Sequence, residues 1–349
     1  MKEQIVSESR PSIEVADQLV GQRRFAPHPA LRNAHAQTIA GTLVRRRFSD
    51  KVLRSEPRLF ETAPGVKVLA HCSWQQSRTK SPVLILIHGL EGSTGSRYML
   101  GTADKAVNAG FNVIRLNMRN CGGTEHLSPT LYHAGLTEDL ASIVNELIEA
   151  DRLRRIYLGG YSLGGNVVLK FAGERGATVP AEVRGVVGVS PSIDLAVCAD
   201  AIERRSNSVY SLRFVWSLRS RLRRKARLYP NRYDLSRLRG AWTIRKYDDA
   251  YVAPHWGFRD VADYYERASA VRVIDRITVP SLIVHAQDDP FIPFAQFQRS
   301  EVAGNANITM LAPQHGGHVG FVSGDCNGEE RFWAERMAVE FVSALERCH

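Results

Sequence analysis

The stretch Ile156-Tyr-Leu-Gly-Gly-Tyr-Ser-Leu-Gly-Gly-Asn166 decides the fold, because it predicts a strand joined to a helix through a turn of glycines and one serine. We expect the strand over 155–161 and the helix over 164–172. Gly160 and Gly164, two residues before and after Ser162, leave room for a close approach of strand and helix. The turn between them forces strained backbone angles on Ser162 and lifts its hydroxyl clear of the sheet.

Short apolar runs alternate with helical patterns on both sides of this turn. They predict strands at 82–89, 111–118, 155–161, 183–189, 281–286 and 308–311. They predict helices at about 97–109, from Thr137 as N-cap, at 164–172, near 293–301 and from about 329 to 346. This alternation is typical of βαβ units, so we expect an α/β fold with a mostly parallel central sheet and helices on both faces.

The alternation breaks for about 75 residues after Ser192. We therefore expect three parts: an N-terminal extension (1–57) packing on the core, a core (58–194 and 271–349), and a helical insert (195–270) after the sixth core strand. Hydrophobic residues make up 44% and charged residues 23% of the chain, which excludes a disordered, collagenous or coiled-coil protein.

The net charge of +10 is concentrated in the insert. Residues 204–246 hold 14 of the 46 Lys and Arg and one acidic residue, so they carry +13, whereas the rest of the chain sums to −3. Apolar residues at helical spacing predict a helix with one apolar face, which Arg219 interrupts: Val209, Leu212, Val215, Trp216, Leu218 and Leu222. The helix is interpreted either as a lid that contacts an anionic membrane or acyl substrate, or as a packed helix with a solvated arginine face. No nucleic-acid-binding module accompanies the charge, so we expect no nucleic acid partner.

The five cysteines are widely spaced and form no C-x-x-C pair, which favours a reducing compartment over a disulfide framework or zinc site. The first ten residues contain no apolar segment typical of a signal peptide, and the longest apolar run, Val83–Ile87, is too short to span a bilayer. A cytoplasmic location is expected. The oligomeric state is not predicted.

The residues Gly160-Tyr161-Ser162-Leu163-Gly164 match the pattern G-x-S-x-G in the strand–turn–helix context that a nucleophilic serine requires. The alternative is a glycine-rich turn with an incidental serine. Two backbone amides are expected to bind a developing oxyanion. One belongs to Leu163 after the nucleophile and the other to Leu90 after His88-Gly89, where the 82–89 strand ends. His88 is interpreted as a structural residue.

A serine nucleophile needs a base, and the base needs an acid that orients it. Asp289 follows the 281–286 strand and His318 follows the 308–311 strand, so both fall at the sheet edge that Ser162 occupies. Asp288 is the next choice for the acid, and Asp194 is a weaker one. His318 is preferred to His315 because Gly316-Gly317 frees the loop to aim it. The H-x-x-H pair lacks further metal ligands at fitting spacing, so no metal and no cofactor is expected.

These motifs resemble the YheT-like family of α/β-hydrolases, bacterial esterases related to medium-chain acyl-ester synthases/esterases of yeast and to phospholipase-like animal proteins. The similar segments span nearly the whole chain: Phe25-Ala-Pro, Leu31-Arg-Asn-Ala-His-Ala-Gln-Thr-Ile39, His88-Gly-Leu-Glu-Gly-Ser93, Gly160–Asn166, Arg245-Lys-Tyr-Asp-Asp249, Asp289-Pro-Phe291 and Gly316–Phe321. The resemblance implies an α/β-hydrolase fold and Ser162, Asp289 and His318 as the charge-relay set. Arg119-Asn-Cys-Gly122 departs from the family pattern, but Asn120 tolerates left-handed backbone angles.

The expected function is that of a serine carboxylic-ester hydrolase, acting through an acyl-enzyme on short- to medium-chain or lipid-like acyl esters. Two alternatives stay open. An acyltransferase would pass the same acyl-enzyme to an alcohol, and a non-catalytic ligand-binding homologue would use the scaffold alone. An aspartate in place of Ser162 would be needed for dehalogenase or epoxide-hydrolase chemistry.

Overall fold

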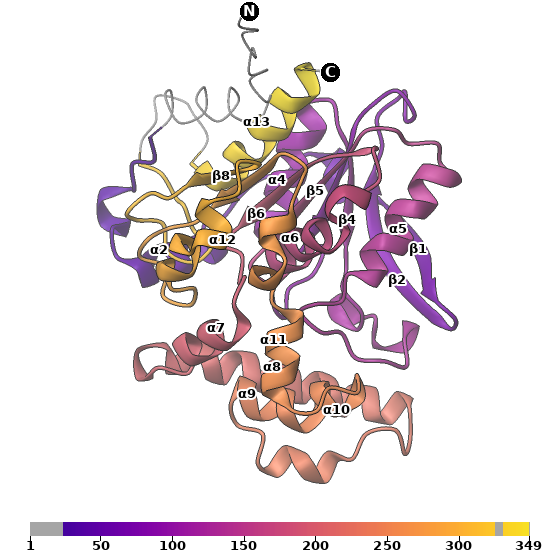
Figure 1. The fold of residues 1–349 in the computed structure, drawn as a ribbon, viewed down its shortest axis with the longest axis vertical. Helices are drawn as coiled ribbons and strands as arrows, with labels where there is room; N and C mark the ends of the chain where they lie inside the picture. Colours follow the sequence, from indigo (N-terminus) through magenta and orange to yellow (C-terminus); the bar gives the residue numbers. More distant parts are fainter. Residues whose placement is uncertain (1–23, 325–330, 349) are drawn as a thin grey trace, which may run out of the picture.

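An eight-stranded sheet forms the centre of the protein in the computed structural model, which describes residues 24–324 and 331–348 (Figure 1). Its strands lie in the order β1-β2-β4-β3-β5-β6-β7-β8. The strands are β1 (Glu56–Ala63), β2 (Val66–Ser73), β3 (Val83–Ile87), β4 (Asn112–Leu116), β5 (Ile156–Tyr161), β6 (Val183–Val189), β7 (Ser281–Val284) and β8 (Ile308–Leu311). β2 pairs antiparallel with β1 and β4, and the remaining pairs are parallel, which confirms the mostly parallel sheet.

The strand β3 shows why this sheet is covered on both faces. Its five residues are all buried. Leu84 and Leu86 join a hydrophobic cluster with α4 (Arg97–Asn108) and α13 (Trp333–Arg347). Ile85 and Ile87 join a second cluster with α5 (Glu138–Glu149) and α6 (Leu163–Arg175). Since successive strand side chains point to opposite faces, a continuous apolar run is what a strand between two helical layers requires.

Several local predictions differ from the structure. The mostly exposed edge strand β1 and its neighbour β2 lack a continuous apolar run, and the sequence patterns do not identify them. The helix α2 (Ala34–Leu43) is not among the predicted helices, and it begins after Asn33, whose side chain accepts the amides of His35 and Ala36. The helix expected at 293–301 is a 3₁₀ turn (Phe294–Gln298) followed by α12 (Ser300–Ala303), since extended backbone at Arg299 separates the two. The expected start of the last helix at about 329 lies outside the described residues.

Two further details concern helix beginnings and the N-terminal region. α5 begins after Thr137 as expected, but the Thr137 hydroxyl donates to Glu174 at 2.5 Å and does not cap the helix. The short helix α3 (Asp50–Leu53) connects α2 to β1.

None of the helices within the described ranges combines the length and apolar character needed to cross a bilayer.

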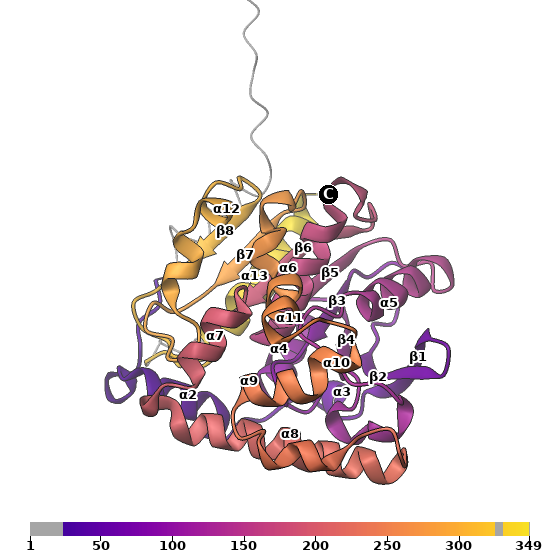
Figure 2. The same cartoon turned by 60° about the horizontal axis from the view of Figure 1, so that its bottom comes forward.

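The chain between β6 and β7 forms a helical insert at one end of the sheet (Figures 1 and 2). Its helices are α7 (Leu195–Ile202), α8 (Ser208–Leu228), α9 (Ile244–Tyr247), a π-helical turn (Asp248–Val252), α10 (Ala253–His255) and α11 (Val261–Ala268). Leu218 and Leu222 of α8 belong to the same buried cluster as the residues of α5 and α6. The insert therefore packs on the core through a continuous apolar interface.

The prediction of one apolar face on α8 is wrong. Val215, Leu218 and Leu222 are buried, whereas Val209, Leu212 and Trp216 are exposed on another side of the helix. Arg219, which was expected to interrupt the apolar face, is itself buried, because its guanidinium has partners within the insert. Its guanidinium lies 3.8 Å above the Trp242 ring and donates to the carbonyl oxygens of Leu238 and Ala241.

The alternative of a packed helix with a solvated arginine face agrees with part of α8, because the helix packs on the core and exposes Arg213, Arg223, Arg224 and Arg227. Three further basic residues of α8 are buried. Arg219 bonds within the insert, as described above. Arg221 pairs with Glu91 of the core, and the Lys225 ammonium donates to the Oδ1 of Asn120 at 2.5 Å. Asn120 has the expected left-handed backbone, with φ 69°. Burial lowers the pKa of Lys225 to about 7. These cations attach the insert to loops of the core.

Candidate active site

Ser162 lies at the turn between β5 and α6. Its backbone angles are φ 53° and ψ −116°, which is the strained conformation expected from the motif. A Cβ on Gly160 would lie 2.1 Å from the carbonyl oxygen of Gly164, and a Cβ on Gly164 would lie 2.3 Å from that of Ile87. Glycine is therefore required at position 160 for α6 to approach β5, and at position 164 for α6 to approach the end of β3.

The structure brings Ser162, His318 and Asp289 together, although they are far apart in the sequence. The Nε2 of His318 lies 3.0 Å from the Ser162 Oγ, and its Nδ1 lies 2.8 Å from Oδ2 of Asp289. Because a carboxylate only accepts hydrogen bonds, Nδ1 carries the hydrogen and Nε2 faces the serine as an acceptor. The arrangement can accept the Ser162 proton and stabilise the resulting imidazolium.

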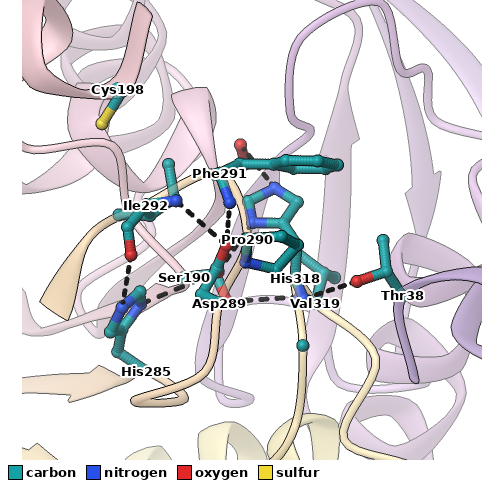
Figure 3. Close-up of polar contacts among 12 residues, drawn as sticks. Thr38, Ser190, Cys198, His285, Asp289, Pro290, Phe291, Ile292, His318 and Val319 are labelled. Atoms are coloured by element: carbon teal, nitrogen blue, oxygen red, sulfur yellow. Dashed lines mark hydrogen bonds and ion pairs between the residues drawn. The ribbon is translucent and has the colours of Figure 1, made fainter. Parts of the chain in front are cut away.

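The Asp289 carboxylate is fixed by its own backbone turn. Its side chain is fully buried, and Oδ1 accepts the amides of Phe291 and Ile292 at 2.8 and 3.0 Å (Figure 3). Oδ2 is left to accept from His318. His285 lies on the other side of the carboxylate, 4.0 Å away, and burial lowers its pKa to about 4, so this ring is neutral at pH 7. His318 is thus the imidazole that shares a hydrogen bond with Asp289.

The alternatives for acid and base have other partners. Asp288 accepts from the Gly317 amide at 2.9 Å and lies 3.2 Å from Nδ1 of His315, which makes a second pair beside the first. Asp194 caps α7 and pairs with Arg299 at 2.9 Å. No group of three or more His, Cys, Asp or Glu in residues 24–324 and 331–348 could hold a metal ion.

The two amides expected to bind the oxyanion lie beside Ser162. Leu163 is the first residue of α6, and Leu90 lies in the turn that follows β3. Within the described ranges, neither amide has a hydrogen-bond partner. A Cβ on Gly89 would lie 3.0 Å from the Ser162 Cβ, so this turn passes directly against the serine. Both amides are therefore available to a ligand atom at Ser162.

His88 has a structural role, as expected. Its Nε2 accepts the Met118 amide at 3.1 Å, so its Nδ1 donates to the Gly89 carbonyl at 2.7 Å. Burial lowers the pKa of His88 to about 4, which keeps the ring neutral at pH 7. The residue joins the ends of β3 and β4 beneath the Leu90 turn.

The N-terminal helix α2 supports the His318 loop, and the sequence patterns do not predict this role. The Thr38 hydroxyl accepts the His318 amide at 2.9 Å (Figure 3). Gln37 exchanges two hydrogen bonds with the backbone of Val322, at 2.7 and 3.0 Å. The only sequence signal is that both residues lie in the family-like segment 31–39.

The insert reaches the Leu90 turn through Glu91. The carboxylate of Glu91 accepts from Ser217 and pairs with Arg221, both on α8, and it accepts from the Tyr132 hydroxyl at 3.1 Å. Glu91 has φ 58°, so the turn holds a strained backbone there. This contact was not predicted, because no local pattern links residues this far apart.

Two hollows meet at Ser162. An inner cavity of about 90 Å³ extends between the sheet end and the insert, and its walls include Leu163, Leu218 and Tyr264 together with the polar groups of Lys225 and Asp248. An outer groove of about 420 Å³ opens between α2 and α8. Ser162, His318, Leu90, Phe214 and Phe291 border both hollows. The serine thus has mostly apolar space on two sides.

Comparisons with known proteins identify the family of this chain. The family model of the alpha/beta hydrolase fold matches residues 82–325. YheT of Escherichia coli (strain K12), named as a candidate esterase, is 31% identical over 95% of this chain and 96% of its own length. The monoacylglycerol lipase of Saccharomyces cerevisiae is 28% identical over 73% of this chain and 58% of its own length. Mouse phospholipase ABHD3 is 25% identical over 76% of this chain and 64% of its own length.

A likeness to solved structures concerns the fold alone. The Pyrococcus furiosus esterase Pf2001 superposes with a TM-score of 0.55 at 16% identity, and the match covers 87% of this chain and 97% of that one. Est1E from Butyrivibrio proteoclasticus gives a TM-score of 0.54 at 17% identity, over 84% of this chain and 100% of that one. The family resemblance inferred from the motifs and the expected fold are both confirmed.

Proposed function

Because this chain belongs to the alpha/beta hydrolase fold family, we propose that it is a serine carboxylic-ester hydrolase with Ser162, His318 and Asp289 as its charge-relay set. The observation that carries this proposal is the unbroken series of hydrogen bonds from Ser162 Oγ through His318 to Asp289, at 3.0 and 2.8 Å. The relatives named as esterases and lipases support ester hydrolysis as the reaction.

In the proposed reaction, Nε2 of His318 takes the hydroxyl proton of Ser162 as Oγ attacks the acyl carbonyl carbon. Asp289 keeps the imidazole in the required tautomer and stabilises its charged form. The amides of Leu90 and Leu163 donate to the oxyanion of the tetrahedral intermediate. His318 then protonates the leaving alcohol, and water, activated by the same imidazole, releases the acid from the acyl-enzyme.

The proposed substrates are short- to medium-chain or lipid-like acyl esters. Both hollows beside Ser162 are bordered largely by apolar side chains, which favours an aliphatic or aromatic substrate over a charged one. The names of the yeast and mouse relatives refer to lipid esters. A peripheral contact with anionic membranes through residues 204–246 belongs to this proposal, and a cytoplasmic location remains a prediction.

A series of p-nitrophenyl esters from acetyl to palmitoyl tests the proposal. We expect hydrolysis by the wild type, with the acyl length at maximal kcat/KM reporting the length of the acyl pocket. Ser162→Ala removes the attacking oxygen and should lower turnover by several orders of magnitude. Ser142→Ala, on the distant helix α5, is the matched control. Unchanged turnover in Ser162→Ala would contradict the proposal.

A further inference from the structure

Five exposed apolar side chains lie on the two helices that border the outer groove. Ile39 and Leu43 of α2 are 45% and 68% exposed, and Val209, Leu212 and Trp216 of α8 are 76%, 57% and 68% exposed. The spacing of four residues on α2, and of three and four on α8, places each set on one side of its helix. We call these five residues the apolar rim.

The two helices of the apolar rim lie side by side across the groove. The rings of His35 on α2 and Tyr210 on α8 stack with centroids 5.7 Å apart. Figure 2 shows α2 next to the beginning of α8 at the end of the molecule that holds the insert. Ile39 and Leu43 also line the groove itself, which continues inward to Ser162. Ile39 and Leu43 thus border the entrance through which a substrate would reach the serine, and the other three rim residues lie on α8, the helix that forms the facing wall.

Positive charge accompanies the apolar rim. Arg32, Arg45 and Arg47 flank α2 and are exposed, and Arg204, Arg205 and Arg213 lie at the beginning of α8 and are exposed. No Asp or Glu occurs between residues 18 and 49, and none occurs between 204 and 233. The surface beside the groove therefore combines aliphatic side chains, a tryptophan and cations.

This combination identifies the partner by its chemistry. Exposed aliphatic side chains partition into the acyl boundary of a bilayer, tryptophan favours the headgroup level, and arginines attract anionic headgroups. A nucleic acid would bind the arginines but would leave the aliphatic side chains in water. A second copy of the chain would bring two positively charged surfaces together, which opposes association.

We propose that the apolar rim docks this protein on the surface of an anionic phospholipid bilayer, with the outer groove opening toward the lipid. The rim narrows the membrane contact proposed for residues 204–246 to one side of α8 and extends it to the helix α2. Hydrolysis of a lipid ester that enters the groove rests on the proposed function. Docking on the bilayer does not require catalysis.

The test measures partition of the Ser162→Ala variant onto vesicles by flotation. Vesicles of phosphatidylcholine with about one-third phosphatidylglycerol are compared with vesicles of phosphatidylcholine alone. We expect stronger binding to the anionic vesicles that weakens as salt screens the arginines. Adding Leu212→Ser and Trp216→Ser should lower the partition coefficient by roughly tenfold or more, because two apolar side chains no longer insert.

The control variant is Leu59→Ser, which removes an exposed leucine from β1, at the sheet edge far from α2 (Figure 1). It should bind vesicles as the parent does. Thermal denaturation of each variant shows whether the fold is kept. An unchanged partition coefficient in the folded rim variant, or tighter binding to a DNA duplex than to anionic vesicles, would overturn the proposal. The flotation assay measures binding alone, so a negative result would contradict the docking proposal and not the esterase proposal. The esterase proposal is tested separately by the p-nitrophenyl ester series.

Discussion

The Nη1 of Arg221 on α8 lies 2.8 Å from Oε1 of Glu91 in the turn that carries Leu90. The two side chains are 10% and 6% exposed, so this ion pair lies at the buried interface between insert and core. Since Leu90 is the proposed oxyanion donor, the insert contributes to holding the proposed oxyanion site in position. The basic charge that the sequence concentrates in 204–246 therefore has a structural use next to the serine.

The Glu91–Arg221 pair can be tested with a double-mutant cycle. Glu91→Gln or Arg221→Met leaves one buried charge without its partner and should cost about 3–5 kcal/mol of unfolding free energy. We expect kcat to fall by about 10²-fold or more, since misplacing one oxyanion donor has that effect. The double variant should lose less than the sum of the single losses. Additive losses in denaturant unfolding, or unchanged kcat in both folded single variants, would contradict the coupling.

Thr38→Val tests whether α2 positions His318. The substitution removes the oxygen that accepts the His318 amide and should cost about 1 kcal/mol of stability. We expect kcat to fall about tenfold with little change in KM, because a misaimed base acts only in the chemical step. Thr278→Val removes an exposed hydrogen bond from a threonine hydroxyl to the Gly176 carbonyl, far from the site, and serves as the control. Equal kcat in both variants would show that the contact is only structural.

Asp248 predicts a pH-dependent stability. Burial raises the pKa of its carboxyl, which accepts from the Tyr265 hydroxyl, to about 7. The pKa of Asp248 is near 3.8 in the unfolded chain and about 7 in the folded one, so between these pH values the folded state binds more protons. The free energy of unfolding therefore falls as the pH rises from about 4 to 7. Asp248→Asn mimics the neutral form. Its stability relative to the wild type should increase by about 3 kcal/mol from pH 5 to pH 8. A difference in unfolding free energy that is constant across this range would refute the assignment.

The close approach at the Ser162 turn predicts that Gly160→Ala is not tolerated. The new methyl group would meet the Gly164 carbonyl, which belongs to the backbone and cannot move aside. We expect a loss of about 3 kcal/mol or more in unfolding free energy, at the upper end of overpacking costs, together with loss of esterase activity. Gly240→Ala is the control, since open space surrounds Gly240 and its φ is −93°. Similar melting temperatures for the two variants would contradict the steric account.

Local sequence patterns predict much of this protein because they reflect local causes. The buried strands β3 and β5 follow from continuous apolar runs, and Ser162 follows from glycines at fixed spacing. Asp289 and His318 follow from the rule that parallel strands present their carboxyl ends at one edge. In each case the deciding information lies within a few residues of the predicted position.

The contacts that no pattern predicts join distant segments. Thr38 meets a residue 280 positions later, and Ser217 of α8 meets Glu91 across 126 positions. The burial of Arg219 depends on Trp242 and on carbonyl oxygens that become available only when the insert folds back on itself. Amphipathic spacing alone could not reveal that the apolar residues of α8 divide between a buried and an exposed side.

The most direct measurement of the central claim is the site at which a fluorophosphonate probe reacts. The account predicts one covalent adduct per chain on Ser162 in the wild type, located by peptide mass spectrometry. It predicts no adduct in Ser162→Ala and strongly slowed labelling in His318→Ala, because the serine then lacks its base. An adduct on another residue, or labelling of Ser162→Ala at the wild-type rate, would contradict it.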